Sequence, residues 1–257
     1  MNSFIIATFN TRVPVDKPPF DWESRAPRCL EIIKRNKFDI FGMQEPRKQQ
    51  VDDIAAGTGF RSIGVGRDDF KDGGEFSNIV YNPERFELLK SGTFGLSEHP
   101  EIPGLVSWNA CCPRIATWGV FRDRLAGGKE FFYCNTHLDH VSEEARVNGI
   151  RLVLERAGKD ATGLPVIITG DFNSFPDGAA YKLAASRLRD VCKVSRKPYE
   201  GPANTFHHWG QGTHTAPIDY IFVSEEFQVL ASWADDTKPF GNFASDHYPV
   251  IAELALP

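Results

Sequence analysis

The sequence predicts an α/β protein in which sheets pack on sheets and helices lie outside them. Three observations predict this class: several short apolar, β-rich runs, segments of helical periodicity between them, and a mixed order of the two along the chain. Hydrophobic residues make up 41% of the 257 residues and charged residues 25%, a mixture that can build one sizeable core. We therefore expect a single domain over residues 1–257.

The N-terminal part of the chain predicts a strand, a helix and a second strand. Residues 4–10 are continuously apolar and β-rich, as in a buried strand. A helix should begin near Pro27 and end at Asn36. Its buried face would be formed by Ala26, Leu30 and Ile33. Residues 39–45 then read as another buried strand, which places Glu45 at that strand's end.

The rest of the chain predicts five more strands and one well-marked helix. The strands cover residues 115–121, 130–137, 165–171, 218–224 and 248–254. Ser142 can cap a helix whose first turn holds Glu143 and Glu144, at the positive end of the helix dipole. The apolar face of this helix would be formed by Ala145, Gly149, Val153 and Ala157.

Two long segments, residues 97–114 and 196–217, are predicted to be loops. The first is rich in Pro and Gly, and the second contains His207, His208, Trp209 and His214. Long ordered loops often form the rims of binding sites, but they also serve as variable surface connections. The sequence leaves both interpretations open.

Composition and charge narrow the function classes. The net charge of −5 and the pI near 5.8 argue against the broad basic surface that long nucleic acid requires. The five cysteines include no CxxC pair, so free thiols are expected rather than a zinc or redox site. The apolar opening is too short for a signal peptide or a membrane span. We expect a cytoplasmic protein with no membrane association and no obligate protein partner.

Short polar clusters adjoin the ends of several predicted strands. They are TFN at 8–10, QE at 44–45, NTHLDH at 135–140, GDFN at 170–173 and SDH at 245–247. Strand ends in α/β proteins collect ligands, so these clusters are expected to converge on one site. Mg²⁺ prefers oxygen ligands. The candidate metal ligands are Glu45, Asn10 and Asp246.

Two pairs of residues, Asp171 with Asn173 and Asp219 with His247, predict the chemistry of that site. Asp171 would orient and deprotonate an attacking water, while Asn173 would hold the water or a phosphoryl oxygen. Asp219 lies in an apolar strand, where a carboxylate is costly unless paired, so it is predicted to meet His247. That partner would raise the pKa of the imidazole, which could then donate to a phosphate.

Three further residues are candidates for the same site. His137 is a second candidate donor, with Glu75 as its expected carboxylate partner, and a structural histidine is the alternative. Arg114 could grip a phosphate oxygen, or it could be an exposed salt-bridging arginine. No GK[ST] loop or GxSxG elbow is present, which argues against a P-loop kinase or a serine hydrolase.

The motifs TFN, QE, THLDH, GDFNSFPD, IDYIF and SDHYP, in this order, resemble the endonuclease/exonuclease/phosphatase superfamily of deoxyribonuclease I and the apurinic endonucleases. The resemblance extends from residue 8 to about residue 250. It implies a four-layer α/β/β/α sandwich of two mixed sheets flanked by helices, with the site at one edge of the sheets. The site residues that it implies are Glu45 and Asn10 with Asp246 at the metal, Asp171 with Asn173 at the water, and Asp219 paired with His247.

Three other stretches are more similar to the deadenylase and nocturnin-like branch and to bacterial proteins of that kind. These stretches are GEFS, PRIATW and THLDH, and the comparison adds Glu75, Arg114 and His137 to the site. The apurinic endonucleases carry an Asp two residues after the first Asn, where this chain has Arg12. That departure argues against DNA repair and leaves metal binding by Glu45 in place.

Together these observations predict a hydrolase that uses Mg²⁺ (or Mn²⁺) to cleave a phosphodiester or phosphomonoester by in-line attack of water. The expected substrates are a nucleotide, a short oligonucleotide or a small phosphorylated metabolite. One alternative is a protein on the same fold that binds a phosphorylated ligand without turnover. The other is a sphingomyelinase-like phospholipid phosphodiesterase, which would need an exposed apolar hairpin. The number of metal ions is left open.

Overall fold

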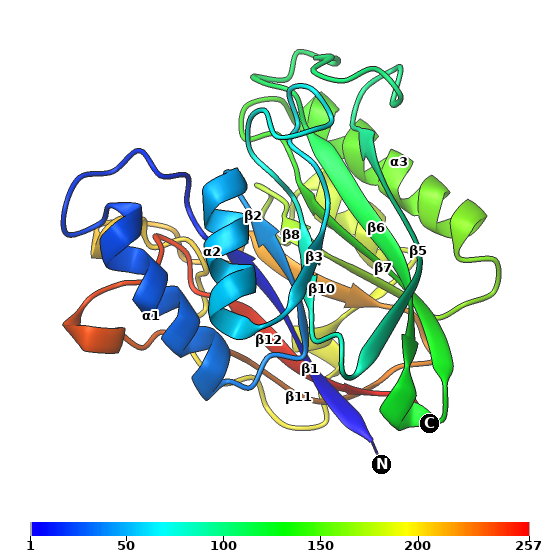
Figure 1. The fold of residues 1–257 in the computed structure, drawn as a ribbon. Coiled ribbons are helices and arrows are strands. Elements are labelled where there is room, and N and C mark those ends of the chain that lie inside the picture. The colour runs from blue at the N-terminus through cyan, green and yellow to red at the C-terminus, as the bar shows by residue number, and fades with distance from the viewer. Residues whose placement is uncertain (1, 257) are drawn as a thin grey trace.

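The computed structural model describes residues 2–256 and contains two six-stranded sheets packed face to face (Figure 1). The first sheet has the order β11 (Gln228–Ala234), β12 (Val250–Ala255), β1 (Ser3–Asn10), β2 (Ile40–Gln44), β4 (Ile79–Tyr81) and β3 (Arg61–Ile63). The second has the order β5 (Phe86–Gly95), β6 (Ile115–Asp123), β7 (Lys129–His137), β8 (Val166–Asp171), β10 (Asp219–Val223) and β9 (Arg189–Asp190). Both sheets contain parallel and antiparallel pairs.

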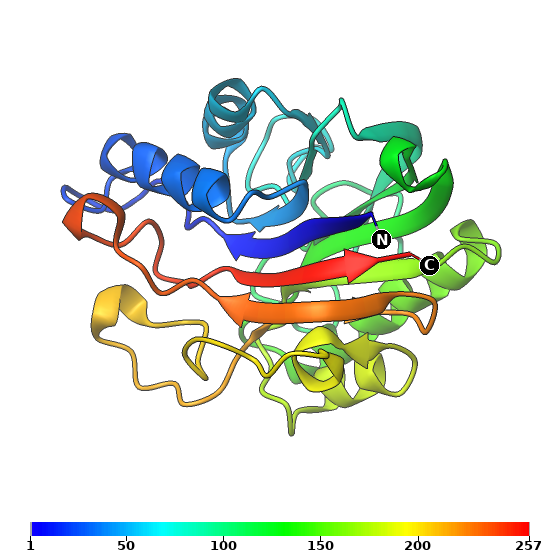
Figure 2. The same ribbon diagram turned by 90° about the horizontal axis from the view of Figure 1, so that it is seen from below.

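Helices cover the outer face of each sheet. The first sheet carries α1 (Trp22–Arg35) and α2 (Lys48–Thr58), and the second carries α3 (Glu143–Asp160) and α4 (Ala179–Ala185). A single-turn helix, α5 (Val191–Val194), follows β9. The expected four-layer α/β/β/α sandwich is therefore confirmed. Figure 2 shows β1, β12 and β11 side by side, with the two ends of the chain near each other.

Three apolar clusters fill the spaces between these layers. The central cluster lies between the sheets, where the ring of Phe4 from β1 stacks on that of Phe131 from β7 at 5.6 Å. On the outside, Ile32 of α1 and Ile54 of α2 pack against the first sheet, and Val153 of α3 packs against the second. Burial of this apolar surface supplies the main favourable free energy of the fold.

The helix expected near Pro27 begins earlier than the sequence predicted. It starts at Trp22, after Asp21 in an extended conformation, and it ends before Asn36 as expected. Pro27 lies in the second turn, where its missing N–H leaves the carbonyl of Glu23 without a helical donor. Burial of one face of the helix offsets this loss. The buried face consists of Trp22, Cys29, Ile32 and Ile33 together with the hydrogen-bonded Arg25, and Ala26 and Leu30 are only partly buried at its edge.

All of the expected strands are present, and α3 begins as predicted. The hydroxyl of Ser142 accepts a hydrogen bond from the amide of Ala145 at 3.2 Å. The expected face, from Ala145 through Gly149 and Val153 to Ala157, is buried. Within segments 97–114 and 196–217 the only regular structure among the described residues is a short helical turn, His208–Gly210. Both segments are therefore loops.

Other elements were not expected from the sequence. They are β3, β4, β5, β9 and β11, and the helices α2, α4 and α5. Strands β3, β4 and β9 are at most three residues long, which is too short for a periodic signal. The middle of β5 is exposed and polar at Lys90 and Ser91. Among residues 2–256, no helix combines the length and apolar character needed to cross a bilayer.

Candidate active site

Strand register places three site residues in one row across the second sheet. His137 at the end of β7 is paired with Asp171 at the end of β8, and Asp171 is paired with Asp219 at the start of β10. Directly paired residues of neighbouring strands point to the same face of a sheet. The register therefore brings one imidazole and two carboxylates together, although they lie far apart in the sequence.

Strand register in the first sheet brings Asn10 and Glu45 together in the same way. Asn10 is paired with Gln44, so Glu45 follows directly at the end of β2. The side-chain amide of Asn10 donates to Oε1 of Glu45 at 2.9 Å and to Oδ2 of Asp171 at 3.0 Å. Because Asp171 belongs to the second sheet, Asn10 connects the polar ends of the two sheets. Its oxygen accepts from the backbone N–H of Arg12 at 3.0 Å.

The segment before β12 contributes His247, which pairs with Asp219 of β10 as predicted. Nδ1 of His247 donates to Oδ2 of Asp219 at 2.9 Å, and its Nε2 lies 3.8 Å from Oδ2 of Asp171. Burial lowers the pKa of this imidazole, but the charge and hydrogen bond of Asp219 outweigh it and raise the pKa of His247 to about 10. The side chain is therefore an imidazolium held by a buried carboxylate.

Asp171 is buried in the centre of the cluster. Burial and the neighbouring charge of Asp219 raise the pKa of Asp171 to about 7, against the opposing effect of His247. Its Oδ1 accepts the backbone N–H of Asn173 at 2.9 Å. Asn173 has a φ of 47°, a left-handed conformation that Asn adopts more readily than most residues. This turn holds the Asn173 side chain beside the carboxylate.

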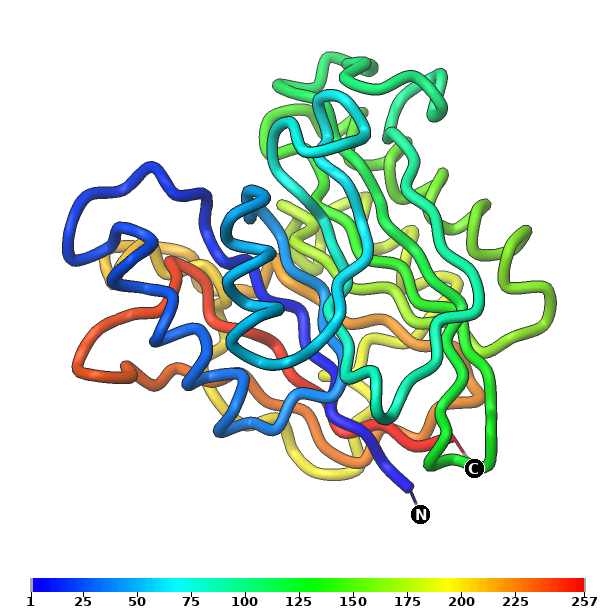
Figure 3. Tube along the Cα trace, in the orientation of Figure 1, coloured from blue at the N-terminus to red at the C-terminus, as the bar shows by residue number. Residues whose placement is uncertain are grey.

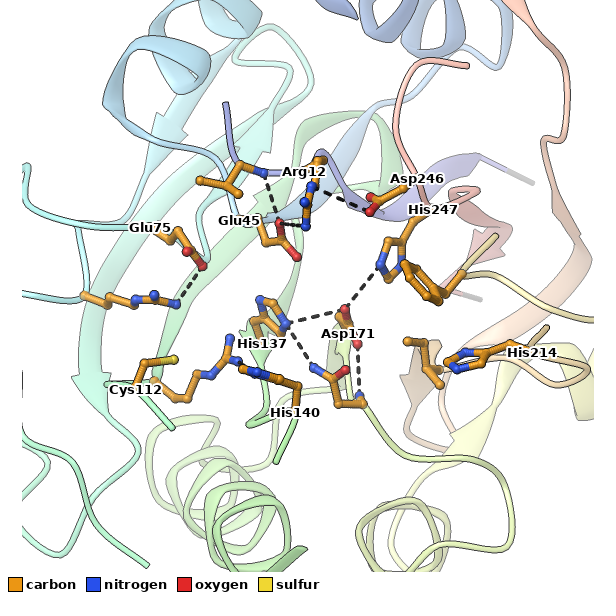
Figure 4. Close-up of a pocket in the computed structure, with 16 residues that line it drawn as sticks. Arg12, Glu45, Glu75, Cys112, His137, His140, Asp171, His214, Asp246 and His247 are labelled. Carbon is orange, nitrogen blue, oxygen red and sulfur yellow. Dashed lines mark hydrogen bonds and ion pairs between the residues drawn. The ribbon is translucent and has the colours of Figure 1, made fainter. Parts of the chain in front are cut away.

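These side chains open into a pocket of about 360 Å³, drawn in Figure 4. The pocket is lined by Arg12, Val13, Glu45, Arg67, Glu75, Cys112, Arg114, His137, His140, Asp171, Asn173, Phe206, His214, Ile218, Asp246 and His247. The structure thus brings all of the predicted site residues together. Asn10 and Asp219 are the two that do not line the pocket themselves, and both hydrogen-bond to residues that do.

One group of donors in this pocket has the spacing of a metal site. Ligand atoms of Glu45, Asp171 and His247 all lie within 4.8 Å of one another. The guanidinium of Arg12 lies between Asp246 and this group. Its Nε is 3.7 Å from Oδ2 of Asp246, and its Nη1 is 3.9 Å from Oε2 of Glu45. Several buried carboxylates in so small a space repel one another, which favours a bound cation. The carboxylates of Glu45 and Asp171 fit a hard divalent ion, whereas the protonated His247 can only donate to a ligand beside it.

Glu45 adopts a backbone conformation that is unusual for its residue type. Its φ is 69°, in the left-handed region. Burial alone would raise the pKa of this carboxyl, but His247 and the hydrogen bond from Asn10 hold the pKa below its usual value. The charged form is therefore favoured at the end of β2, as a metal ligand requires.

The expected pairing of Glu75 with His137 is wrong. Oε2 of Glu75 instead accepts from Nη1 of Arg67 at 2.6 Å. Nε2 of His137 faces the amide of Asn173 at 3.1 Å and Oδ2 of Asp171 at 3.5 Å. Burial and the charges of Arg114 and Arg67 hold the pKa of His137 well below its usual value. A neutral imidazole whose Nε2 accepts from Asn173 agrees with this environment.

Arg114 is not the exposed surface arginine of the alternative interpretation. Its side chain is 6% exposed, Nη2 donates to Nδ1 of His140 at 2.9 Å, and Nε lies 3.6 Å from Oδ2 of Asp139. Asp139 is itself fixed by the backbone N–H groups of Val141 and Ser142. The guanidinium is therefore held at the pocket wall before any ligand binds.

The two long loops form opposite parts of the rim. Segment 97–114 supplies Cys112 and Arg114, and segment 196–217 supplies Phe206 and His214. Figure 3 shows segments 64–76 and 97–114 next to each other at one end of the molecule, where the N–H of Gly104 donates to the carbonyl of Arg67 at 3.3 Å. Arg67, Phe206 and His214 were not predicted, because no strand end or motif marks them in the sequence.

Comparison with known proteins supports the motif resemblance. A family model described as the endonuclease/exonuclease/phosphatase family matches residues 7–247. An endonuclease/exonuclease/phosphatase from Bacteroides vulgatus is 35% identical, with a TM-score of 0.94 over 100% of both chains. A mannosyl-6-phosphatase from Bacteroides thetaiotaomicron is 33% identical, with a TM-score of 0.90 over 98% of this chain and 99% of that one.

More distant proteins share the fold or part of the sequence. The human nocturnin catalytic domain is 21% identical, with a TM-score of 0.77 over 99% of this chain and 95% of its own, a likeness of fold alone. The chain spans about a third of the length of the curated relatives it matches, 33% and 31% respectively.

Proposed function

The chain belongs to the endonuclease/exonuclease/phosphatase family, and from this premise we propose that it is a metal-dependent phosphoesterase that hydrolyses a small phosphate ester by in-line attack of water. One observation carries the proposal. Glu45 from the first sheet, Asp171 from the second and His247 before β12 meet within 4.8 Å in a pocket that opens to solvent. Relatives named as phosphatases support hydrolysis of phosphate esters in general.

The cation would be Mg²⁺ or Mn²⁺. Glu45 would hold it, with Asn10 and Asp246 beside it and the carboxylate of Asp171 nearby. Asn10 presents its N–H to Glu45, so binding through its oxygen requires the amide to turn over. When bound, the cation supplies a Lewis acid that polarises the phosphoryl group.

The water would be positioned by Asp171 and Asn173. Asp171 offers a carboxylate oxygen that can accept the proton of the water, and Asn173 lines the pocket next to it. The amide of Asn173 donates to the carbonyl of Leu138 at 3.0 Å and to Nε2 of His137. His137 therefore acts by orienting Asn173.

Charge that develops on the phosphoryl group would be met by His247 and Arg114. His247 is an imidazolium whose orientation is fixed by Asp219, so its Nε2–H faces the pocket. Arg114 also lines the pocket, where it is held by His140 and Asp139. Donors that are fixed in advance stabilise a developing anion without having to reorganise during the reaction.

Asp171→Asn tests the proposal directly. With Mn²⁺, wild type should hydrolyse p-nitrophenyl phosphate, bis-p-nitrophenyl phosphate or a member of a nucleotide and sugar phosphate panel, and EDTA should stop the reaction. The variant should lose about 10²- to 10⁴-fold in kcat, the usual contribution of a general base. Asp177→Asn, an exposed carboxylate in the same loop, is the matched control and should retain activity.

Two results would contradict the proposal. A folded wild-type protein that cleaves no phosphate ester with either cation would exclude the enzyme. If wild type and Asp171→Asn bind a phosphorylated ligand with equal affinity and neither turns it over, the protein is a binding protein on this fold. Calorimetric titration with the panel compounds separates the two cases.

A further inference from the structure

Glu75 is a pocket carboxylate that the proposed chemistry does not use. Figure 4 shows it on the side of the pocket opposite His247 and Asp246, with its carboxylate directed toward the centre. Its side chain is 16% exposed. It lies outside the cluster of Glu45, Asp171 and His247, and it does not contact His137. Its position calls for a different explanation.

The loop around Glu75 is built to hold this carboxylate in place. The 2.6 Å contact with Nη1 of Arg67 fixes one oxygen, and the backbone N–H of Arg67 donates to the carbonyl of Glu75 at 3.0 Å. Gly66 and Phe76 form a β-bridge that closes the loop just outside these two residues. A charge-assisted pair between fixed backbone segments loses little side-chain entropy when a ligand binds.

The charge of Glu75 decides what it can recognise. An ionised carboxylate only accepts hydrogen bonds, and it repels the phosphate for which the rest of the pocket is suited. A substrate group that binds Glu75 is therefore a hydrogen-bond donor rather than a second anion. Vicinal hydroxyl groups meet this requirement, as when a carboxylate binds the hydroxyls of a ribose.

The neighbours of Glu75 favour a hydroxyl-rich group rather than a planar base. Arg67, Arg114 and His140 line this side and offer further polar contacts, whereas the aromatic and apolar side chains of Phe206 and Ile218 belong to the other side of the lining, next to His247 and Asp219. Nη2 of Arg67 and Nη1 of Arg114 make no hydrogen bond within residues 2–256, so they remain available to ligand oxygens.

We propose that Glu75, oriented by Arg67, accepts hydrogen bonds from hydroxyl groups of the substrate and that the substrate is a sugar monophosphate. The inference rests on the proposed function and adds the part of the substrate that does not react. The phosphate lies at Glu45, Asp171 and His247, and the sugar extends toward Glu75. A relative named as a mannosyl-6-phosphatase, 33% identical over nearly the whole chain, is consistent with this class.

The test compares substrates with and without a sugar. We expect wild type to hydrolyse mannose 6-phosphate or another hexose 6-phosphate with a higher kcat/KM than phenyl phosphate. In Glu75→Gln the ratio of the two kcat/KM values should fall about 10- to 100-fold, the usual effect of losing charge-assisted hydrogen bonds. Glu101→Gln removes an exposed carboxylate from a neighbouring loop and should leave the ratio as in wild type.

Arg67 is a positioning residue, so its substitution should change KM for the sugar phosphate more than kcat. Arg67→Met should lower the same ratio mainly through a higher KM for the sugar phosphate, because Glu75 is no longer fixed before binding. Hexose 6-phosphates that lack one hydroxyl each give a second measurement with wild type alone, independent of how any variant folds. At least one of them should lose about tenfold or more in kcat/KM, and that loss should shrink in Glu75→Gln.

The outcomes separate this inference from the proposed function. If wild type cleaves phenyl phosphate but shows no preference for sugar phosphates, or if every deoxy sugar reacts equally, the inference is wrong and the phosphoesterase stands. A preference for ribonucleoside 5′-monophosphates over hexose phosphates that depends on Glu75 would overturn the sugar monophosphate class. If wild type cleaves no phosphate ester with either metal ion, both this inference and the proposed function are wrong.

Discussion

At the scale of single residues, one glycine permits a buried polar network between the sheets. Gly42 in β2 faces Asn135 of β7, and a Cβ at this position would lie 2.2 Å from Oδ1 of Asn135 and 2.7 Å from Oγ1 of Thr169. That oxygen of Asn135 accepts from Gln44 at 2.7 Å and from Thr169 at 2.9 Å. The network fixes β2, which ends at Glu45, against the strands of the second sheet.

Gly42→Ala should therefore destabilise the protein and weaken hydrolysis. The added methyl group forces Asn135 out of place and leaves buried polar atoms without partners, so we expect a loss of about 2–4 kcal/mol in the free energy of unfolding. Gly158→Ala is the matched control, because a Cβ there meets no atom within 4 Å and alanine favours the helix α3 by up to about 1 kcal/mol. Urea denaturation of both variants measures the difference, and equal midpoints would contradict the role of Gly42.

At the scale of elements, the start of α3 also anchors the loop that carries Arg114. Ser142 caps the helix by accepting from the N–H of Ala145, and its own hydroxyl donates to the carbonyl of Trp108 at 2.7 Å. Trp108 lies in segment 97–114 with a φ of 53°. One side chain thus serves both the helix and the pocket rim, which connects local helix formation to the geometry of the site.

Two substitutions at Ser142 separate these effects. Ser142→Ala loses both contacts and should cost about 1–2 kcal/mol of stability. Ser142→Asp keeps an acceptor for the helix N–H groups but cannot donate to Trp108, so it should recover most of the stability. Only the loop contact would then be missing, and we expect a raised KM for phosphate esters in Ser142→Asp. Thermal melting together with steady-state kinetics checks this, and a KM equal to that of wild type would exclude the loop role.

Elements with a local signal could be predicted from the sequence, and those without one could not. The apolar strands and the capped helix α3 carry their pattern within a few residues, whereas β3 and β9 are defined only by their neighbours. The first turn of α1 is fixed by the burial of Trp22, which tertiary packing decides.

At the scale of the whole molecule, the pocket forms where the polar ends of two sheets meet. The sequence predicted this convergence because each polar cluster adjoins an apolar strand, and the strand register then fixed which residues are neighbours. The partner of Glu75 could not be predicted, because Arg67 reaches it only through the closed loop bridged at Gly66 and Phe76. The approach of Phe206 and His214 likewise depends on how a long loop folds back over the sheets.

The same convergence predicts that a divalent cation stabilises the entire fold. Glu45 belongs to the first sheet and Asp171 to the second, so a cation held between their carboxylates would connect the two sheets. Without a cation the carboxylates repel one another, and global unfolding separates them. A ligand that binds only the folded state stabilises it by about 2.7 kcal/mol at a hundred times its Kd.

Adding Mn²⁺ or Mg²⁺ to metal-free protein should accordingly raise Tm by about 5–10 °C at saturating concentration. In Glu45→Gln this shift should largely disappear, whereas Glu84→Gln, an exposed carboxylate outside the pocket, should keep it. In Arg12→Met the guanidinium charge, which lies 3.9 Å from Glu45 and 3.7 Å from Asp246, is removed. The metal ion then no longer competes with this charge for the carboxylates, so the same rise in Tm should appear at a lower metal concentration. A Tm that does not respond to either cation in wild type would show that these carboxylates hold no metal, and a shift that persists in Glu45→Gln would place the ion elsewhere.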